Sequence, residues 1–75
     1  MTALSHLETF VEVARRGSFA GAARGLGLPR STVTARIKSL EEELGVALFH
    51  RTTRQVRLTR EGEAYLSSVR PAMAQ

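Results

Sequence analysis

The chain has 75 residues, of which 43% are hydrophobic, and its 11 basic and 7 acidic residues give a formal net charge of +4. This length predicts a single small domain, and the hydrophobic share excludes the composition of a disordered tail. Cysteine does not occur, which excludes disulfide bonds and thiolate metal sites and favours a reducing cytoplasmic location.

The first predicted element is a helix over residues 6–16. Ser5, followed three positions later by Glu8, predicts a capping box at its start. Gly17 predicts its end, directly after two arginines that suit the negative end of the helix dipole. Apolar residues recur at the spacing that lines one face of a helix, and these residues are Leu7, Phe10, Val11 and Ala14.

A second and a third helix follow after short turns. Ser18 predicts the N-cap of a helix over residues 19–26, whose small central side chains allow a close approach to another helix. Gly27 predicts a left-handed end to that helix. Pro29 is expected to begin the third helix, over residues 30–44.

The third helix has two faces of different chemistry. One is an apolar stripe that is expected to face the core, and its members are Val33, Ile37, Leu40 and Leu44. The other is small, polar and basic, and its members are Ser31, Thr34, Ala35 and Lys38.

The short helix and the helix after it form a candidate helix-turn-helix. In that motif the start of the second helix enters the major groove of DNA and presents side chains to the base edges. Arg30 could fork onto guanine, and the hydroxyls of Ser31 and Thr34 could reach bases or phosphates. Residues 41–43 are glutamates, and they are expected to point away from the phosphates, toward solvent or neighbouring helices. An ordinary solvated helix face is the alternative interpretation.

Two short strands joined at residues 52–54 are predicted next, with Val56 and Leu58 facing inward. Such a hairpin after a recognition helix is typical of a wing whose arginines reach phosphates or the minor groove. The alternative is an edge hairpin whose arginines only prevent strands of different molecules from pairing. The basic residues of this hairpin are Arg51, Arg54 and the outward-facing Arg57.

Thr59 predicts the N-cap of a fourth helix that begins at about Arg60. Pro71 is expected to kink or end this helix, because proline lacks a backbone donor. The apolar positions of the helix are Tyr65, Leu66, Val69 and Met73.

The residues give no support for an enzyme. His6 and His50 are far apart in sequence without metal-like partners, so both are expected at the surface or on the wing. Two histidines without cysteine or aspartate do not make a convincing nucleophile–base pair. We therefore expect no catalytic residues, no metal and no cofactor.

Two rival functions remain open from the residues alone. The same helix-turn-helix shape could serve as a protein-interaction module without specific DNA readout. A basic amphipathic element on a membrane is the second rival, but separate, capped helices with apolar stripes favour a shared core. The apolar residues are dispersed, so neither a transmembrane segment nor a secretion signal is expected.

Several short motifs match one known family in order and without gaps, over nearly the whole chain. They are Leu7-Glu8-Thr9-Phe10, Gly17-Ser18-Phe19 with Ala22-Ala23, Leu28 to Ile37, Leu40-Glu41-Glu42-Glu43-Leu44-Gly45, Leu48-Phe49-His50-Arg51-Thr52 and Leu58-Thr59-Arg60-Glu61-Gly62. On these residues the chain resembles the N-terminal DNA-binding domain of LysR-type transcriptional regulators.

The resemblance implies an all-α winged helix-turn-helix with a three-helix core, a two-stranded β wing and a C-terminal linker helix. Residues 1–58 would form the DNA-binding domain, and residues 59–75 would begin a linker helix that pairs with its twin through Tyr65, Leu66, Val69 and Met73. A larger domain that binds a small-molecule effector would follow. We then expect a homodimer or higher homo-oligomer on an interrupted palindrome of double-stranded DNA, in the cytoplasm at the nucleoid.

The family's base-reading positions correspond here to Arg30, Ser31, Thr34 and Ala35, and its wing arginines to Arg51 and Arg54. The chain departs from the family's pattern at three positions. They are Pro29 in place of a capping Ser or Thr, Ala35 where arginine is common, and Pro71 within the linker helix. Ala35 should favour an apolar contact such as a thymine methyl. The full set of expected DNA contacts is Arg30, Ser31, Thr32, Thr34, Ala35, Arg36, Lys38, Arg51, Thr52, Arg54 and Arg57.

Overall fold

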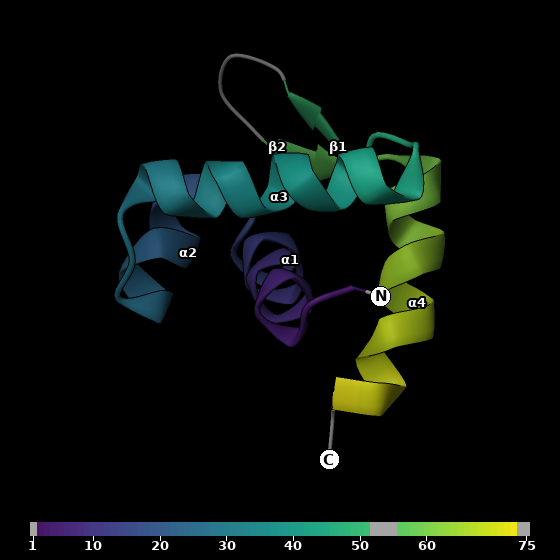
Figure 1. The fold of residues 1–75 in the computed structure, drawn as a ribbon, viewed down its shortest axis with the longest axis horizontal. Coiled ribbons are helices and arrows are strands. Elements are labelled where there is room, and N and C mark those ends of the chain that lie inside the picture. The colour runs from purple at the N-terminus through teal and green to yellow at the C-terminus, as the bar shows by residue number, and fades with distance from the viewer. Residues whose placement is uncertain (1, 52–55, 74–75) are drawn as a thin grey trace.

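Four helices and one two-stranded sheet make up residues 2–51 and 56–73, which are the residues that this computed structural model describes. Figure 1 shows their arrangement, with α1 passing beneath α3, α2 at the start of α3 and α4 at its end. The elements are α1 (Leu4–Arg16), α2 (Phe19–Leu26), α3 (Arg30–Leu44), β1 (Phe49–Arg51), β2 (Val56–Leu58) and α4 (Arg60–Met73).

The core lies where the first three helices meet the wing. The predicted stripe of α3 is confirmed, because Val33, Ile37 and Leu40 are fully buried and Leu44 is half-buried. Each such aliphatic side chain contributes about 1.5–3 kcal/mol when it leaves water. The other core residues come from α1, α2 and the segment that leads into the wing, and they are Phe10, Val13, Phe19, Ala22, Ala23, Leu48 and Phe49.

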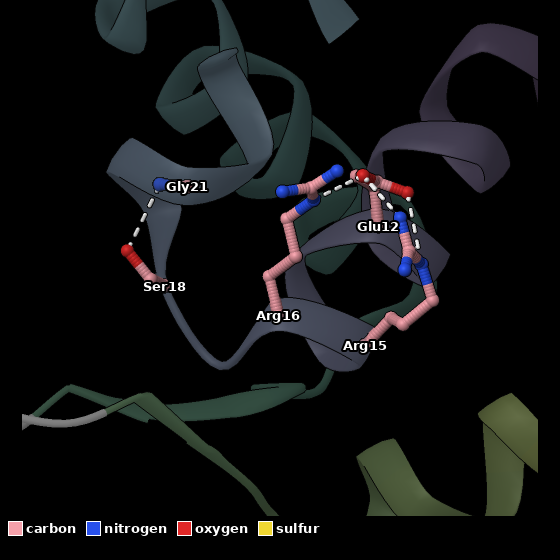
Figure 2. Close-up of polar contacts among 5 residues, drawn as sticks. All are labelled: Glu12, Arg15, Arg16, Ser18 and Gly21. Atoms are coloured by element: carbon pink, nitrogen blue, oxygen red, sulfur yellow. Dashed lines mark hydrogen bonds and ion pairs between the residues drawn. The ribbon is translucent and has the colours of Figure 1, made fainter. Parts of the chain in front are cut away.

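The predicted turns between helices are confirmed. The Ser18 hydroxyl accepts a hydrogen bond from the Gly21 amide at 3.0 Å and so caps α2 (Figure 2). Gly27 ends α2 at a φ of 69°, a left-handed conformation that glycine adopts without strain. The same conformation ends α1 at Gly17 and α3 at Gly45.

The predicted start of the first helix is wrong. α1 begins at Leu4, because the Ala3 carbonyl already accepts the amides of His6 at 3.1 Å and Leu7 at 3.3 Å. Ser5 therefore lies inside the helix, and its carbonyl accepts a hydrogen bond from the Thr9 hydroxyl at 2.7 Å. The predicted capping box does not form, because the helix begins two residues before Ser5 could cap it, at the N-cap residue Ala3, which has no capping side chain.

The wing strands are antiparallel, with Phe49 opposite Leu58 and Arg51 opposite Val56. Val56 and Leu58 are half-buried against the core while Arg57 is exposed, so the predicted alternation is confirmed. The predicted joining segment at residues 52–54 lies outside the described residues.

The predicted cap of the fourth helix is confirmed. The Thr59 hydroxyl accepts the Gly62 amide at 2.9 Å and donates to the Ala47 carbonyl at 2.6 Å. Through these two hydrogen bonds, one hydroxyl joins the start of α4 to the segment before the wing. Gly62 lies so close to that segment that an added Cβ would be 2.1 Å from the Leu48 carbonyl oxygen.

Pro71 was predicted either to kink or to end the fourth helix. The second alternative is wrong, because α4 does not end at Pro71. The helix continues to Met73, because a missing amide so near the C-terminus removes a single hydrogen bond of the last turn. Tyr65, Leu66 and Val69 are half-buried against the core. The Tyr65 ring lies 5.5 Å from the Phe10 ring between centroids, so it packs as expected. The side chain of Met73 lies outside the described residues.

Candidate nucleic-acid interface

α3 carries seven of the eleven side chains predicted to meet DNA. Arg30, Ser31, Ala35 and Lys38 are exposed, and Thr34 is half-buried. Ser31, Ala35 and Lys38 lie on the outer face of the helix, on the far side from the buried stripe, and Arg30 flanks this face at the first residue of the helix. The core therefore fixes α3 while the face remains accessible. The face is slim enough for a groove about 12 Å wide. From Ser31 to Lys38 it has no acidic residue, and the exposed Glu42 follows one turn later.

α3 begins directly after Pro29, as predicted. The Pro29 carbonyl accepts the amides of Thr32 at 3.0 Å and Val33 at 3.3 Å, so the amides of Arg30 and Ser31 precede the first hydrogen-bonded turn. Amides at a helix start attract anions, and the first turn of α3 contains no acidic residue. This end of the helix therefore suits a phosphate.

Glu41 points toward the wing segment and not toward solvent or a neighbouring helix, which corrects the prediction for this residue. Its carboxylate accepts the backbone amides of Leu48 at 2.8 Å and Phe49 at 3.4 Å, and the Arg51 guanidinium at 2.7 Å. The carboxylate thus fixes the start of β1 against the end of α3. Glu42 is exposed as expected, and Glu43 accepts a hydrogen bond from the Thr2 hydroxyl at 2.7 Å.

Arg51 is held by two partners within the chain. Besides its ion pair with Glu41, its guanidinium carbon lies 5.6 Å from the centroid of the Phe19 ring. The side chain is still 43% exposed, and a guanidinium has five donors. Arg51 can therefore position the wing and keep donors for a phosphate.

On the second wing strand, Arg57 is exposed and pairs across the sheet with the exposed His50. The surface position of His50 is as expected. The predicted contacts Thr52 and Arg54 lie outside the described residues, so the hairpin's described basic surface consists of Arg51 and Arg57.

Arg36 lies beside the outer face of α3 and is half-buried. One of its guanidinium nitrogens, Nη1, donates to the hydroxyl of the buried Thr9 at 3.4 Å. This contact orients the side chain sideways, toward α1. Thr32, the remaining predicted contact on this helix, is half-buried.

A groove between the start of α1 and the middle of α3 was not predicted from the sequence. It is lined by His6, Ser31, Thr32, Ala35, Arg36 and Ser39. His6 is half-buried rather than a free surface residue, and its Nδ1 is buried without a hydrogen-bond partner among the described residues. The groove was not predicted because it forms where two helices cross, and helix crossings cannot be inferred from periodicity. In addition, the predicted first helix began at residue 6 and so omitted the first residues of α1.

Two further findings concern the described residues alone. Within residues 2–51 and 56–73, no three histidine or acidic side chains are grouped so that they could hold a metal ion. In the same residues, no helix has the length and hydrophobicity needed to cross a membrane.

The family follows from a comparison of the whole sequence with known families. Residues 4–63 match the family described as "Bacterial regulatory helix-turn-helix protein, lysR family". The chain belongs to this family. The match runs from the first residue of α1 into α4, and therefore includes the complete α2–α3 pair and both described strands of the wing.

Relatives within the lysR family include proteins of opposite regulatory effect. An HTH-type transcriptional repressor of Pseudomonas aeruginosa is 44% identical over 75 residues, which are 100% of this chain and 24% of the repressor. The HTH-type transcriptional activator AllS of Salmonella typhimurium is 48% identical over 68 residues, which are 91% of this chain and 22% of the activator. The chain thus spans about a quarter of the length of these relatives.

A solved structure shows the same fold. The crystal structure of the "BenM_DBD/benA site 1 DNA Complex" superimposes with a TM-score of 0.92 at 35% identity, covering 96% of this chain and 81% of that chain. The lysR-family chain described here is therefore a winged helix-turn-helix, as the resemblance implied.

Proposed function

We propose that this chain binds double-stranded DNA sequence-specifically as the DNA-binding part of a bacterial transcriptional regulator. The observation that carries the proposal is the outer face of the first part of α3, which the core fixes from behind. It is exposed at Ser31, Ala35 and Lys38, has no acidic residue up to Lys38, and is flanked by the exposed Arg30. The similar BenM structure was solved as a DNA complex. An interaction module without DNA readout would need neither this charge pattern nor the basic wing.

The residues have different roles in this proposal. Arg30 reads a base edge in the major groove, Ser31 and Thr34 offer hydroxyls, and Ala35 contacts a thymine methyl. Other residues contact the backbone or the minor groove and contribute affinity that is largely independent of sequence. This second set comprises Thr32, Arg36 and Lys38 on α3, and Arg51, Thr52, Arg54 and Arg57 on the wing.

The proposed active form is a homodimer or higher homo-oligomer. Residues 1–58 bind DNA, and residues 59–75 begin a linker helix whose apolar side chains Tyr65, Leu66, Val69 and Met73 pair with a second copy. Two half-sites about one helical turn apart, roughly 34–36 Å, then make an interrupted palindrome. Since the chain spans about a quarter of its relatives, we propose that a small-molecule effector acts through a separate domain of the complete protein.

The same proposal assigns no catalytic activity to the chain, in line with relatives that are named as transcriptional regulators. It also places the protein in the cytoplasm, at the nucleoid, where bacterial regulators meet the chromosome. Because one relative is named a repressor and another an activator, the proposal does not assign activation or repression to this protein.

Selection of bound sequences from a random pool of duplex DNA tests the proposal. We expect enrichment of an interrupted palindrome, or of one half-site if these 75 residues bind as a monomer. Salt-sensitive binding without any enriched sequence would contradict the proposal. That result would favour the interaction module, with only non-specific electrostatic attachment to DNA.

A further inference from the structure

The groove beside α3 has the chemistry of an anion site. Of its lining residues, Ser31, Thr32 and Ser39 offer hydroxyl donors, and Arg36 offers a guanidinium. None of the side chains that line it is a carboxylate. An anionic oxygen in this groove would therefore meet several donors and no acidic lining residue.

Arg36 and His6, the two nitrogen-bearing side chains of the groove, use only part of their hydrogen-bonding capacity within the described residues. Thr9 holds Arg36 through one long hydrogen bond of 3.4 Å to Nη1, and a guanidinium has further donors. The imidazole of His6 has a buried Nδ1 without a hydrogen-bond partner among the described residues. Buried polar atoms are nearly always hydrogen-bonded. Because this Nδ1 has almost no accessible surface, a ligand in the groove meets it only when the imidazole ring turns.

We propose that this groove binds a phosphate group of the DNA backbone, with Arg36 and His6 as its main contacts. The inference rests on the proposed function and adds His6 to the DNA contacts. A backbone phosphate fits better than a free ion because Ser31 and Ala35 belong both to the groove and to the outer face of α3. A duplex seated on that face passes the open side of the groove.

The test replaces one backbone phosphate at a time by a neutral methylphosphonate, in a duplex that carries the selected sequence. The dissociation constant is measured for the wild type, His6→Gln and Arg36→Gln. We expect one position in each half-site where the replacement weakens the wild type about tenfold, as loss of a charge-assisted hydrogen bond implies. At that position alone, the replacement should weaken each variant clearly less than it weakens the wild type, because one of the two contacts to the phosphate is already lost.

Arg24→Gln is the matched control, because it removes the same charge from an exposed arginine that does not line the groove. This variant should keep the wild-type tenfold loss at the groove phosphate. Thermal unfolding of each variant checks folding, and either His6→Gln or Arg36→Gln is sufficient if the other does not fold.

Three results would overturn the inference in distinguishable ways. If the wild type does not prefer the selected duplex over a shuffled one, the proposed function fails and the groove site fails with it. If the wild type is specific but both variants keep its loss at every phosphate, only the groove site is wrong. If inorganic phosphate alone shifts the ring resonances of His6 and no backbone position depends on His6, the groove binds a free ion instead.

Discussion

At position 41, one carboxylate serves three donors of the wing segment: the amides of Leu48 and Phe49 and the guanidinium of Arg51. We expect Glu41→Gln to lower the free energy of unfolding by about 1–3 kcal/mol, because an amide cannot accept all these bonds and adds donors of its own. Urea unfolding measures the change. Glu42→Gln, in the same turn but exposed, should change stability by less than about 0.5 kcal/mol. Equal stabilities of the two variants would refute this role of Glu41.

Arg30 and Arg57 are both exposed arginines, but they are expected to contribute differently to DNA binding. Arg30→Ala should relax specificity at one base position by about 1–3 kcal/mol, because it removes a fork onto a base edge. Arg57→Ala should weaken binding to all sequences alike and lower the salt slope by about one. Titrations of the selected duplex and its single-base variants separate the two effects. A uniform loss for Arg30→Ala would make Arg30 a phosphate contact.

At the scale of the elements, the start of α4 fits against the segment before the wing only because residue 62 has no side chain. A Cβ there would be 2.1 Å from the Leu48 carbonyl oxygen and 3.0 Å from its carbonyl carbon. Since backbone must move to make room, Gly62→Ala should destabilise the fold by about 1–3 kcal/mol.

Gly21→Ala is the control for that substitution, because it adds the same methyl group to another helix. The nearest atom to its Cβ would be the Ser18 Cβ at 3.4 Å, an ordinary contact. A gain of up to about 1 kcal/mol is expected there from helix propensity. If chemical unfolding found the two alanine variants equally stable, the close approach of α4 would not constrain the fold.

The stability of a cluster of ion pairs at the end of α1 is expected to depend on pH. Glu12 accepts hydrogen bonds from both Arg16 and Arg15 (Figure 2). The hydrogen bond from Arg16, followed by that from Arg15, lowers the pKa of Glu12 below its usual value of 4.5 although its partial burial opposes the shift. A lowered folded-state pKa stabilises the protein above the unfolded pKa, and this contribution is lost as the pH falls through the folded value.

We therefore expect Glu12→Gln to lower the melting temperature at pH 7 and to have a smaller effect at an acidic pH below 4.5, where the carboxylate becomes protonated. The loss at pH 7 should be at most about 1 kcal/mol, because both arginines are more than a third exposed and water screens the pairs. Glu8→Gln, at an exposed position of the same helix, serves as the control. An effect of Glu12→Gln that is equal at both pH values would argue against the ion pairs.

Helix ends at Gly17, Gly27 and Gly45 were predictable because a left-handed residue is a local property of the backbone. The buried stripe of α3 was predictable for a similar reason, since its spacing is written in one helix. By contrast, Glu41 and His6 act through contacts with segments that are distant in sequence or cross at an angle. Periodicity and capping patterns contain no information about such contacts. The start of α1 was missed for a local reason, because its first turn forms at Ala3, which has no capping side chain.

For the whole molecule, the predicted affinity comes mainly from phosphates and the predicted specificity from α3. If a dimer neutralises ~6–10 phosphates, binding should weaken ~10³–10⁵-fold between 50 and 200 mM salt. Arg51 and Arg57 lie on the wing, while Arg30 and Lys38 lie on α3. A basic surface formed by two separate elements can contact the backbone on both sides of a groove.

The most direct test compares the affinity of the chain for the selected duplex with that for a shuffled duplex of the same composition, at one fixed salt concentration. Sequence-specific readout by α3 predicts a ratio of dissociation constants on the order of 10³ or more. The ratio should fall in Arg30→Ala, because one base contact is then missing. A ratio near one, with both affinities equally sensitive to salt, would contradict specific DNA recognition by this domain.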